Sequence, residues 1–149
     1  MATIRLAPDF KEFLRLLRSA RIEYLLVGGY AVGHYGYPRA TGDLDIWVAI
    51  HEENGVRLVK TLREFGFDVP ALRPELFQEL GHVVRMGIPP VRLEILTSID
   101  GVDFAECYLR RSTEEVDGIP VDIISLEDLK TNKRAAGRNQ DLNDLDHLP

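Results

Sequence analysis

Two aspartates separated by one residue are the part of this sequence best suited to chemistry. Asp43 and Asp45 begin the apolar segment 43–50, whose composition predicts a β-strand. Successive side chains of a strand alternate between its two faces, so both carboxylates should point to the same side. Two like charges on one face repel each other unless a cation lies between them. The spacing favours Mg²⁺, which binds one or two carboxylates together with phosphate oxygens.

A glycine pair precedes this acidic strand. Gly28 and Gly29 follow the apolar segment 22–27 and lead into a short helix expected at 30–35. Glycines let backbone N–H groups approach a phosphate, and the N-terminus of a helix favours negative charge. A glycine pair alone is typical of a turn, and two aspartates alone are typical of a solvated strand end. Their combination, in the order strand, glycine pair, helix and acidic strand, indicates nucleotide chemistry.

A third carboxylate, Glu94, interrupts the apolar stretch VRLEILT. A charged side chain in such a strand is unfavourable to bury without a partner. Glu94 should therefore either pair with a neighbouring cation, for which Arg92 is the nearest candidate, or complete a metal site with the aspartate pair. Asp122, in the stretch IPVDIIS, is a weaker candidate for the same place.

A lysine lies on the apolar stripe of a helix expected at 126–136. Lys133 would bury its stem there and carry its ammonium group toward whatever the helix packs on. Phosphate oxygens or the acidic cluster would be suitable partners. A salt bridge to Asp141 or Asp144, or a lysine whose head reaches the surface, is the structural alternative.

The remaining apolar pattern predicts alternating helices and strands. Asp9 and Glu12 are expected to cap a helix with apolar residues at 10, 13, 14 and 17. Trp47, two residues after Asp45, is expected to pack in the core or at its rim. Further strands are expected at 82–86 and 91–97, a helix at 52–65, helix or irregular structure at 70–80, and a last short helix after 137. The layout indicates an α/β protein with one domain over 1–149.

Composition narrows the classes of function. The 149 residues are 45% hydrophobic and 28% charged, as in soluble globular proteins. The apolar runs are too short to span a membrane, and the first residues lack the apolar core of a signal peptide, so a cytoplasmic location is expected. The single cysteine, Cys107, excludes an internal disulfide and should be a buried or half-buried apolar group. A net charge of −6 argues against broad electrostatic binding to nucleic acid.

The stretch from Gly28-Gly29 to Arg39-x-Thr41-x-Asp43-Leu44-Asp45 resembles the nucleotidyltransferase superfamily of DNA polymerase beta and kanamycin nucleotidyltransferase. The stretches RLEILTSIDGVDF and ISLEDLKTNKRAAGRNQDLNDLDHL look most like the small bacterial proteins related to abortive-infection (AbiEii-type) toxin nucleotidyltransferases. This resemblance covers roughly residues 24–148.

The resemblance implies a mixed twisted sheet flanked by helices, in the α+β manner, with further helices at the C-terminal end. It implies that Asp43, Asp45 and Glu94 form a catalytic metal triad for two Mg²⁺ ions, which Mn²⁺ can replace. Gly28 and Gly29 would hold the nucleoside triphosphate. Arg39, Thr41 and Lys133 occupy recurrent motif positions that are expected to bind the nucleotide, with a phosphate contact for Lys133.

The expected activity is Mg²⁺-dependent transfer of a nucleoside monophosphate from a triphosphate to a hydroxyl group of tRNA or another RNA, a protein or a small molecule. A role in toxin–antitoxin or defence systems would follow from the resemblance. The full-length toxins carry a further helical region, so the acceptor platform is expected either to be missing or to come from a helical partner protein or from self-association. The alternatives are a nucleotide-binding module without turnover and a metal-dependent phosphotransferase or hydrolase.

Overall fold

The computed structural model describes residues 4–149, which form a six-stranded sheet and six α-helices. The strands are β1 (Tyr24–Val27), β2 (Asp43–Val48), β3 (Val83–Ile88), β4 (Val91–Leu96), β5 (Ser112–Val116) and β6 (Ile119–Ile123). The helices are α1 (Pro8–Ser19), α2 (Gly28–His34), α3 (Glu52–Phe65), α4 (Phe104–Leu109), α5 (Leu126–Ala136) and α6 (Asn139–His147), with a 3-10 helix, η1 (Pro74–Phe77), after α3.

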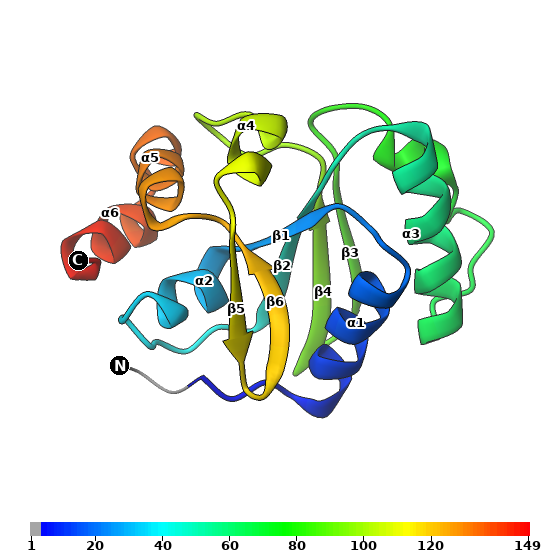
Figure 1. The fold of residues 1–149 in the computed structure, drawn as a ribbon, viewed down its shortest axis with the longest axis horizontal. Coiled ribbons are helices and arrows are strands. Elements are labelled where there is room, and N and C mark those ends of the chain that lie inside the picture. The colour runs from blue at the N-terminus through cyan, green and yellow to red at the C-terminus, as the bar shows by residue number, and fades with distance from the viewer. Residues whose placement is uncertain (1–3) are drawn as a thin grey trace.

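Helices lie on both sides of the sheet, whose strand order is β3-β4-β2-β1-β6-β5 (Figure 1). In Figure 1, α1 and α3 lie together on one side, and α5 and α6 lie on the opposite side. β1 is antiparallel to β2 and parallel to β6, whereas β2 is parallel to β4. The expected mixed sheet with C-terminal helices is therefore confirmed. Of the helices within 4–149, none has the length and apolar character needed to cross a membrane.

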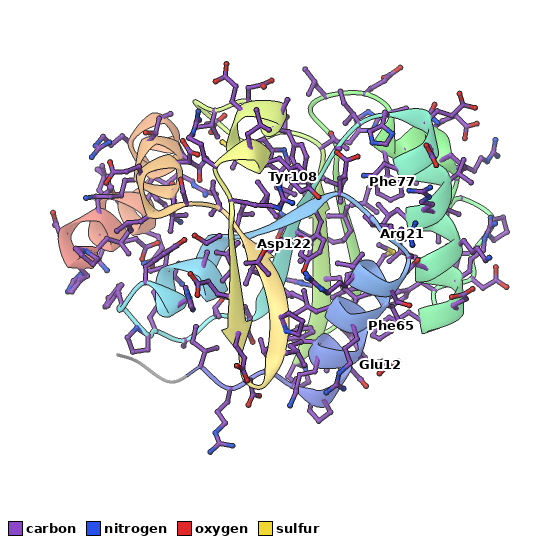
Figure 2. All side chains as sticks on the ribbon, viewed as in Figure 1. Glu12, Arg21, Phe65, Phe77, Tyr108 and Asp122 are labelled. Carbon is purple, nitrogen blue, oxygen red and sulfur yellow. The ribbon has the colours of Figure 1, made fainter. Side chains whose placement is uncertain are left out.

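The apolar stripe of α1 packs into the core, as its spacing predicts. Phe10, Phe13, Leu14 and Leu17 are all buried, and the ring of Phe13 packs on Phe65 of α3 with 5.3 Å between centroids (Figure 2).

The predicted cap of α1 is wrong, because the helix begins at Pro8, after Ala7, without a side-chain hydrogen bond. Proline suits this first position, since its fixed φ is helical and its missing N–H would have had no partner there.

The two central strands are shorter than predicted. β1 begins at Tyr24 because the preceding residues still belong to the turn that ends α1: Arg21 has a φ of 58°, and the N–H of Ile22 donates to the carbonyl of Leu17. β2 ends at Val48 rather than at Ile50. Every residue of β1 is buried, in agreement with a strand covered on both faces.

Three elements between β4 and α5, namely α4, β5 and β6, were not predicted. α4 has only six residues, too few for a helical period to stand out, and Asp103 caps it by accepting the N–H of Glu106. β5 and β6 form a hairpin whose turn places Asp117 and Gly118 at positive φ, 48° and 85°. The Asp-Gly pair is a sequence signal for such a turn, so the hairpin was recognisable.

The strand that carries the aspartates is held by the side chains on its other face. Leu44 is fully buried there. We expect Leu44→Ala to lower the free energy of unfolding by about 2–5 kcal/mol, because it removes buried methyl groups and leaves a cavity. Urea unfolding measures this loss. Val56→Ala, at a side chain that is 50% exposed, is the control and should change stability by about 0.5 kcal/mol or less. Equal effects of the two substitutions would contradict this packing.

Candidate active site

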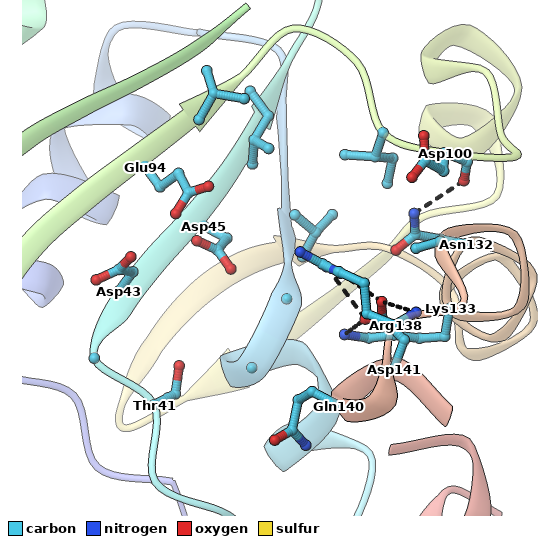
Figure 3. Close-up of a pocket in the computed structure, with 18 of the residues that line it drawn as sticks. Thr41, Asp43, Asp45, Glu94, Asp100, Asn132, Lys133, Arg138, Gln140 and Asp141 are labelled. Atoms are coloured by element: carbon cyan, nitrogen blue, oxygen red, sulfur yellow. Dashed lines mark hydrogen bonds and ion pairs between the residues drawn. The ribbon is translucent and has the colours of Figure 1, made fainter. Parts of the chain in front are cut away.

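The pairing of β2 with β4 brings the three carboxylates together. Asp45 lies opposite Glu94 in the parallel register, and Asp43 lies two residues away on the same face of β2. One oxygen from each carboxylate lies within 4.8 Å of the others. Figure 3 shows the three side chains converging on one side of a cleft. The structure thus groups the three residues that the sequence singled out, and their role as metal ligands stays a prediction.

Asp122, the weaker candidate, lies elsewhere. Its carboxylate on β6 accepts a hydrogen bond from the Thr113 hydroxyl and pairs with Arg18 and Arg111 (Figure 2). These partners explain its charge fully, so Asp122 has a structural role.

Asp45 is the least compensated charge of the cluster. Its Oδ1 atom is buried and has no hydrogen-bond partner. Burial, followed by repulsion from Glu94 and Asp43, raises the pKa of Asp45 from 3.8 to about 7. A buried acceptor without a donor normally costs about 1–3 kcal/mol, and a divalent cation would remove this cost. The donor set therefore fits a hard divalent cation held by the three carboxylates.

Arginines from the neighbouring strands approach the other two carboxylates. Arg92 of β4 donates two hydrogen bonds to Asp43, at 2.9 and 3.1 Å, and these bonds lower the pKa of Asp43. Arg85 of β3 lies 3.6 Å from Glu94. The alternative in which Arg92 pairs with Glu94 is wrong, because the register places Arg92 directly opposite Asp43.

The glycine pair is required by close packing against site residues. Gly28 has a φ of 69°, and a Cβ atom there would lie 2.0 Å from Oδ2 of Asp45. A Cβ atom on Gly29 would lie 2.4 Å from Oγ1 of Thr41. Both glycines line the cleft, where the lack of side chains leaves the main chain open to a ligand.

The cleft has a volume of about 780 Å³ and is lined by charged side chains of both signs. Lys133 and Arg138 lie across from the three carboxylates, at the ends of α5 and α6 (Figure 3). Acidic and basic groups facing each other across an open cleft suit a ligand that carries phosphates and comes with a cation.

Lys133 forms a salt bridge within the protein, which is the structural alternative to a phosphate contact. Its ammonium group lies 3.1 Å from Asp141 and 3.1 Å from Asp144, and all three side chains are buried. Burial alone would raise the pKa of Asp144, but hydrogen bonds from Arg39 and Lys133 lower it overall. The ammonium group therefore has its counter-charges within the protein, and its predicted phosphate contact stays a prediction.

Arg39 belongs to the same network, which we call the C-terminal charge network: Arg39, Lys133, Arg138, Asp141 and Asp144. Arg39 donates two hydrogen bonds to Asp144, at 2.8 and 3.0 Å, and so ties the loop before β2 to α6. Arg39, like Thr41, lines the cleft. The structure thus places both predicted nucleotide-binding residues at the cleft, but Arg39 already has a partner.

Arg138 is a candidate that sequence reasoning missed. Its side chain is 78% exposed, lines the cleft and donates to Asp141. Arg85 and Arg92 were also missed as cleft residues. The position of Arg138 just after Gly137, which ends α5 in the left-handed conformation, marked a turn, but no spacing tied that turn to the aspartates.

Comparison with known proteins gives a likeness in fold. No protein-family model matches the sequence, and a search of curated proteins finds no match either. Among solved structures, a Thermotoga maritima protein provisionally named a nucleotidyltransferase matches with a TM-score of 0.62 and 18% identity, over 95% of this chain and 93% of that one. An antigenic nucleotidyltransferase-like protein from Paracoccidioides brasiliensis matches with a TM-score of 0.53 and 20% identity, over 93% of this chain and 73% of that one. The chain has the fold of these two structures.

The burial of Lys133 in a salt bridge predicts a role in stability, whereas the sequence predicted a phosphate contact. Lys133→Met should lower the free energy of unfolding by about 3–5 kcal/mol, because it leaves two buried carboxylates without their shared cation. Thermal and urea unfolding measure this. Arg134→Met, at the exposed neighbouring position of α5, is the control and should change stability by about 0.5 kcal/mol or less. Unchanged stability with weakened triphosphate binding would instead make Lys133 a phosphate ligand.

The raised pKa of Asp45 makes stability depend on pH. Without metal, the folded protein keeps the proton of Asp45 up to a pH of about 7, whereas the unfolded chain loses it near the ordinary pKa of 3.8. Between these two pH values the folded state binds the additional proton. The stability contributed by this group is therefore present below that interval and is lost as pH rises through it. We expect Asp45→Asn to gain roughly 2–4 kcal/mol over the native protein as pH rises from about 5 to about 8.

Urea unfolding of both proteins in the presence of a chelator measures this difference. Asp146→Asn, which removes an exposed carboxylate of α6, should follow the native protein at every pH. Parallel curves for the native protein and Asp45→Asn would show that Asp45 is ionised at no cost, which contradicts a raised pKa.

Proposed function

We propose that the protein transfers a nucleoside monophosphate from a nucleoside triphosphate to an acceptor hydroxyl, with Mg²⁺ as the cofactor and Mn²⁺ as a substitute. The observation that carries this proposal is the buried, unpartnered Oδ1 of Asp45, in a carboxylate that is grouped with Asp43 and Glu94 and whose other oxygen packs against Gly28. Fold likeness to two proteins with nucleotidyltransferase names supports the reaction class. A place in a toxin–antitoxin or defence system rests on the sequence resemblance alone.

The three carboxylates would hold the cations, and two ions are expected from the resemblance. Bound divalent cations would supply positive charge to the triphosphate and to the attacking and leaving oxygens. Positioning and charge stabilisation carry most of phosphoryl transfer, so no side-chain nucleophile is needed. Arg92 and Arg85 pair with Asp43 and Glu94, so a cation bound by the carboxylates would compete with these arginines for the same oxygens.

The transfer forms one bond and breaks one. The acceptor oxygen forms a bond to the α-phosphorus, and the bond from this phosphorus to the α–β bridging oxygen breaks, so pyrophosphate leaves with the bonding electrons. Glu94 accepts the proton of the acceptor hydroxyl. Arg138, exposed at the basic side of the cleft, neutralises the charge that builds on pyrophosphate. Asp141 accepts hydrogen bonds from Arg138 and Lys133 and so holds both side chains at this end of the cleft.

A labelling experiment tests the proposal by the bond that breaks. Each common nucleotide, labelled at the α-phosphate, is offered with Mg²⁺ to pools of RNA, protein and small molecules. We expect pyrophosphate release and a labelled acceptor, with activity lowered at least about 100-fold in Asp45→Asn. Asp146→Asn, the same chemical change at an exposed site, should keep full activity.

The other outcomes point to the other functions. Label transferred only from the γ-phosphate would identify a phosphotransferase and contradict the proposal. Nucleotide binding without any product would favour a binding module. Equal activity of the two aspartate variants would remove the carboxylate triad from the reaction.

A further inference from the structure

A second cavity, of about 760 Å³, opens beside the cleft. Most of its lining is apolar and comes from the end of β2, the segment before β3, the segment after β4, and α4. The apolar residues include Trp47, Leu80, Ile99, Phe104, Tyr108 and Leu109. Its volume lies within the range of about 300–1,000 Å³ that is usual for small-molecule sites. The nucleotide and metal chemistry proposed above uses none of these residues.

The two cavities share a wall. Ser98 and Ile99 line both of them. The wall is fixed to the segment before β3, because the Gly81 N–H donates to Oγ of Ser98 at 3.0 Å and the His82 N–H donates to Oγ1 of Thr97 at 2.8 Å. A molecule that occupies the apolar cavity therefore adjoins the cleft across a defined edge.

The strand register sets the distance between them. On one face of β2, β4 and β3, the charged row is Asp45, Glu94 and Arg85, and the next row is Trp47, Leu96 and Val83. Two residues along a strand span about 6.6 Å. A molecule held in the apolar cavity would therefore reach the carboxylates past the shared edge at Ser98 and Ile99, over a distance of about this size.

Two buried polar atoms that lack hydrogen-bond partners lie on this same face of β2. Within residues 4–149, the buried side-chain nitrogen and oxygen atoms without a hydrogen-bond partner are Oδ1 of Asp45 and Nε1 of Trp47. They belong to residues two apart on the same face of one strand. Native proteins leave few such atoms unpaired, and those that remain call for an explanation such as a functional role. Oδ1 of Asp45 lacks a cation or donor, whereas Nε1 of Trp47 lacks an acceptor.

The mouth of the cavity exposes apolar side chains. Leu109 is 84% exposed and Leu80 is 67% exposed. Behind them, the ring of Phe104 meets Trp47 edge-on at 5.1 Å and stacks on Tyr108 at 5.4 Å; Figure 2 labels Tyr108 in this region. Exposed apolar side chains gathered around a hollow indicate a ligand or a partner.

Charge argues against nucleic acid as the occupant. The described residues that line the cavity include the carboxylates Glu23 and Asp103 but no lysine or arginine. A phosphate backbone is bound through such cations, and the chain carries a net charge of −6. The cavity therefore favours an uncharged apolar molecule.

We propose that this cavity binds the aromatic or alkyl portion of a small-molecule acceptor and directs its hydroxyl group to Asp45 and Glu94. This acceptor role rests on the proposed nucleotidyl transfer. The reaction is the same as for any acceptor hydroxyl: the acceptor oxygen gains the bond to the α-phosphorus, Glu94 takes the proton, and pyrophosphate leaves.

Trp47 provides a direct test of binding, because it is the chain's one tryptophan. Its fluorescence is followed while para-butylphenol or cyclohexylmethanol is added, with glycerol as the polar control. We expect a saturable change with the two apolar alcohols and none with glycerol. A variant with Leu80→Asp and Leu109→Asp, both at exposed positions, should fold normally and bind about tenfold more weakly. Ile88→Asp, at a side chain 80% exposed on β3 and outside both cavities, is the matched control and should bind normally.

The outcomes separate this inference from the proposed function. No saturable change, or equal affinity in the Leu80/Leu109 variant, overturns the apolar site. Self-association that this variant abolishes, without alcohol binding, would assign the cavity to a second copy of the chain and overturn it too. Saturable binding without transfer of an α-label to the alcohol contradicts the acceptor role and leaves only an apolar binding site. Transfer to RNA that the variant does not affect keeps nucleotidyl transfer and overturns the acceptor cavity.

Discussion

Repulsion among three carboxylates on two adjacent strands is the constraint around which this structure is built. Asp45 lies opposite Glu94 and two residues from Asp43, with one of its oxygens buried and unpartnered. A sheet that served stability alone would place an apolar residue there, since buried charge without a partner opposes folding. The apolar face of β2 and the fully buried β1 supply the packing that holds these charges in place. The cluster therefore makes physical sense as a site for a cation.

The two groups of buried charged residues differ in how fully their charges are paired. In the C-terminal charge network, Asp141 and Asp144 are paired with cations through short hydrogen bonds, and their pKa values are lowered. In the acidic triad the pKa of Asp45 is raised. The first group fastens α5, α6 and the loop before β2 to one another. In the second group, Arg92 and Arg85 pair with Asp43 and Glu94 but leave Oδ1 of Asp45 without a partner, and this distinguishes the triad from the C-terminal charge network.

The pattern of apolar and polar residues within a single helix or strand was enough to predict the features that depend on that element alone. Alternation along a strand placed Asp43 and Asp45 on one face, and helical spacing identified the buried stripe of α1. The presence of a charged residue within an apolar strand identified Glu94 as the third carboxylate of the cluster. The Asp-Gly turn between β5 and β6 carried an equally local signal that was overlooked.

What sequence reasoning missed depends on contacts between distant segments. Arg92 meets Asp43 rather than Glu94 because of the register between β2 and β4, which no property of either strand alone reveals. The stripe predicted that Lys133 is buried, and Asp141 and Asp144 were among its expected partners, but the choice between them and a phosphate depended on how α6 returns along α5. The apolar cavity beside Trp47 likewise joins β2 to α4, which lie far apart in sequence.

The most direct test of the cation site is a calorimetric titration of Mn²⁺ into the native protein and into Asp45→Asn, with Asp146→Asn as the exposed control. If the three carboxylates form such a site, the native protein and the control bind Mn²⁺ alike, Mg²⁺ competes, and Asp45→Asn loses binding while remaining folded. Equal Mn²⁺ affinity in all three proteins would contradict it, because the unpartnered oxygen of Asp45 would then have no part in holding a cation.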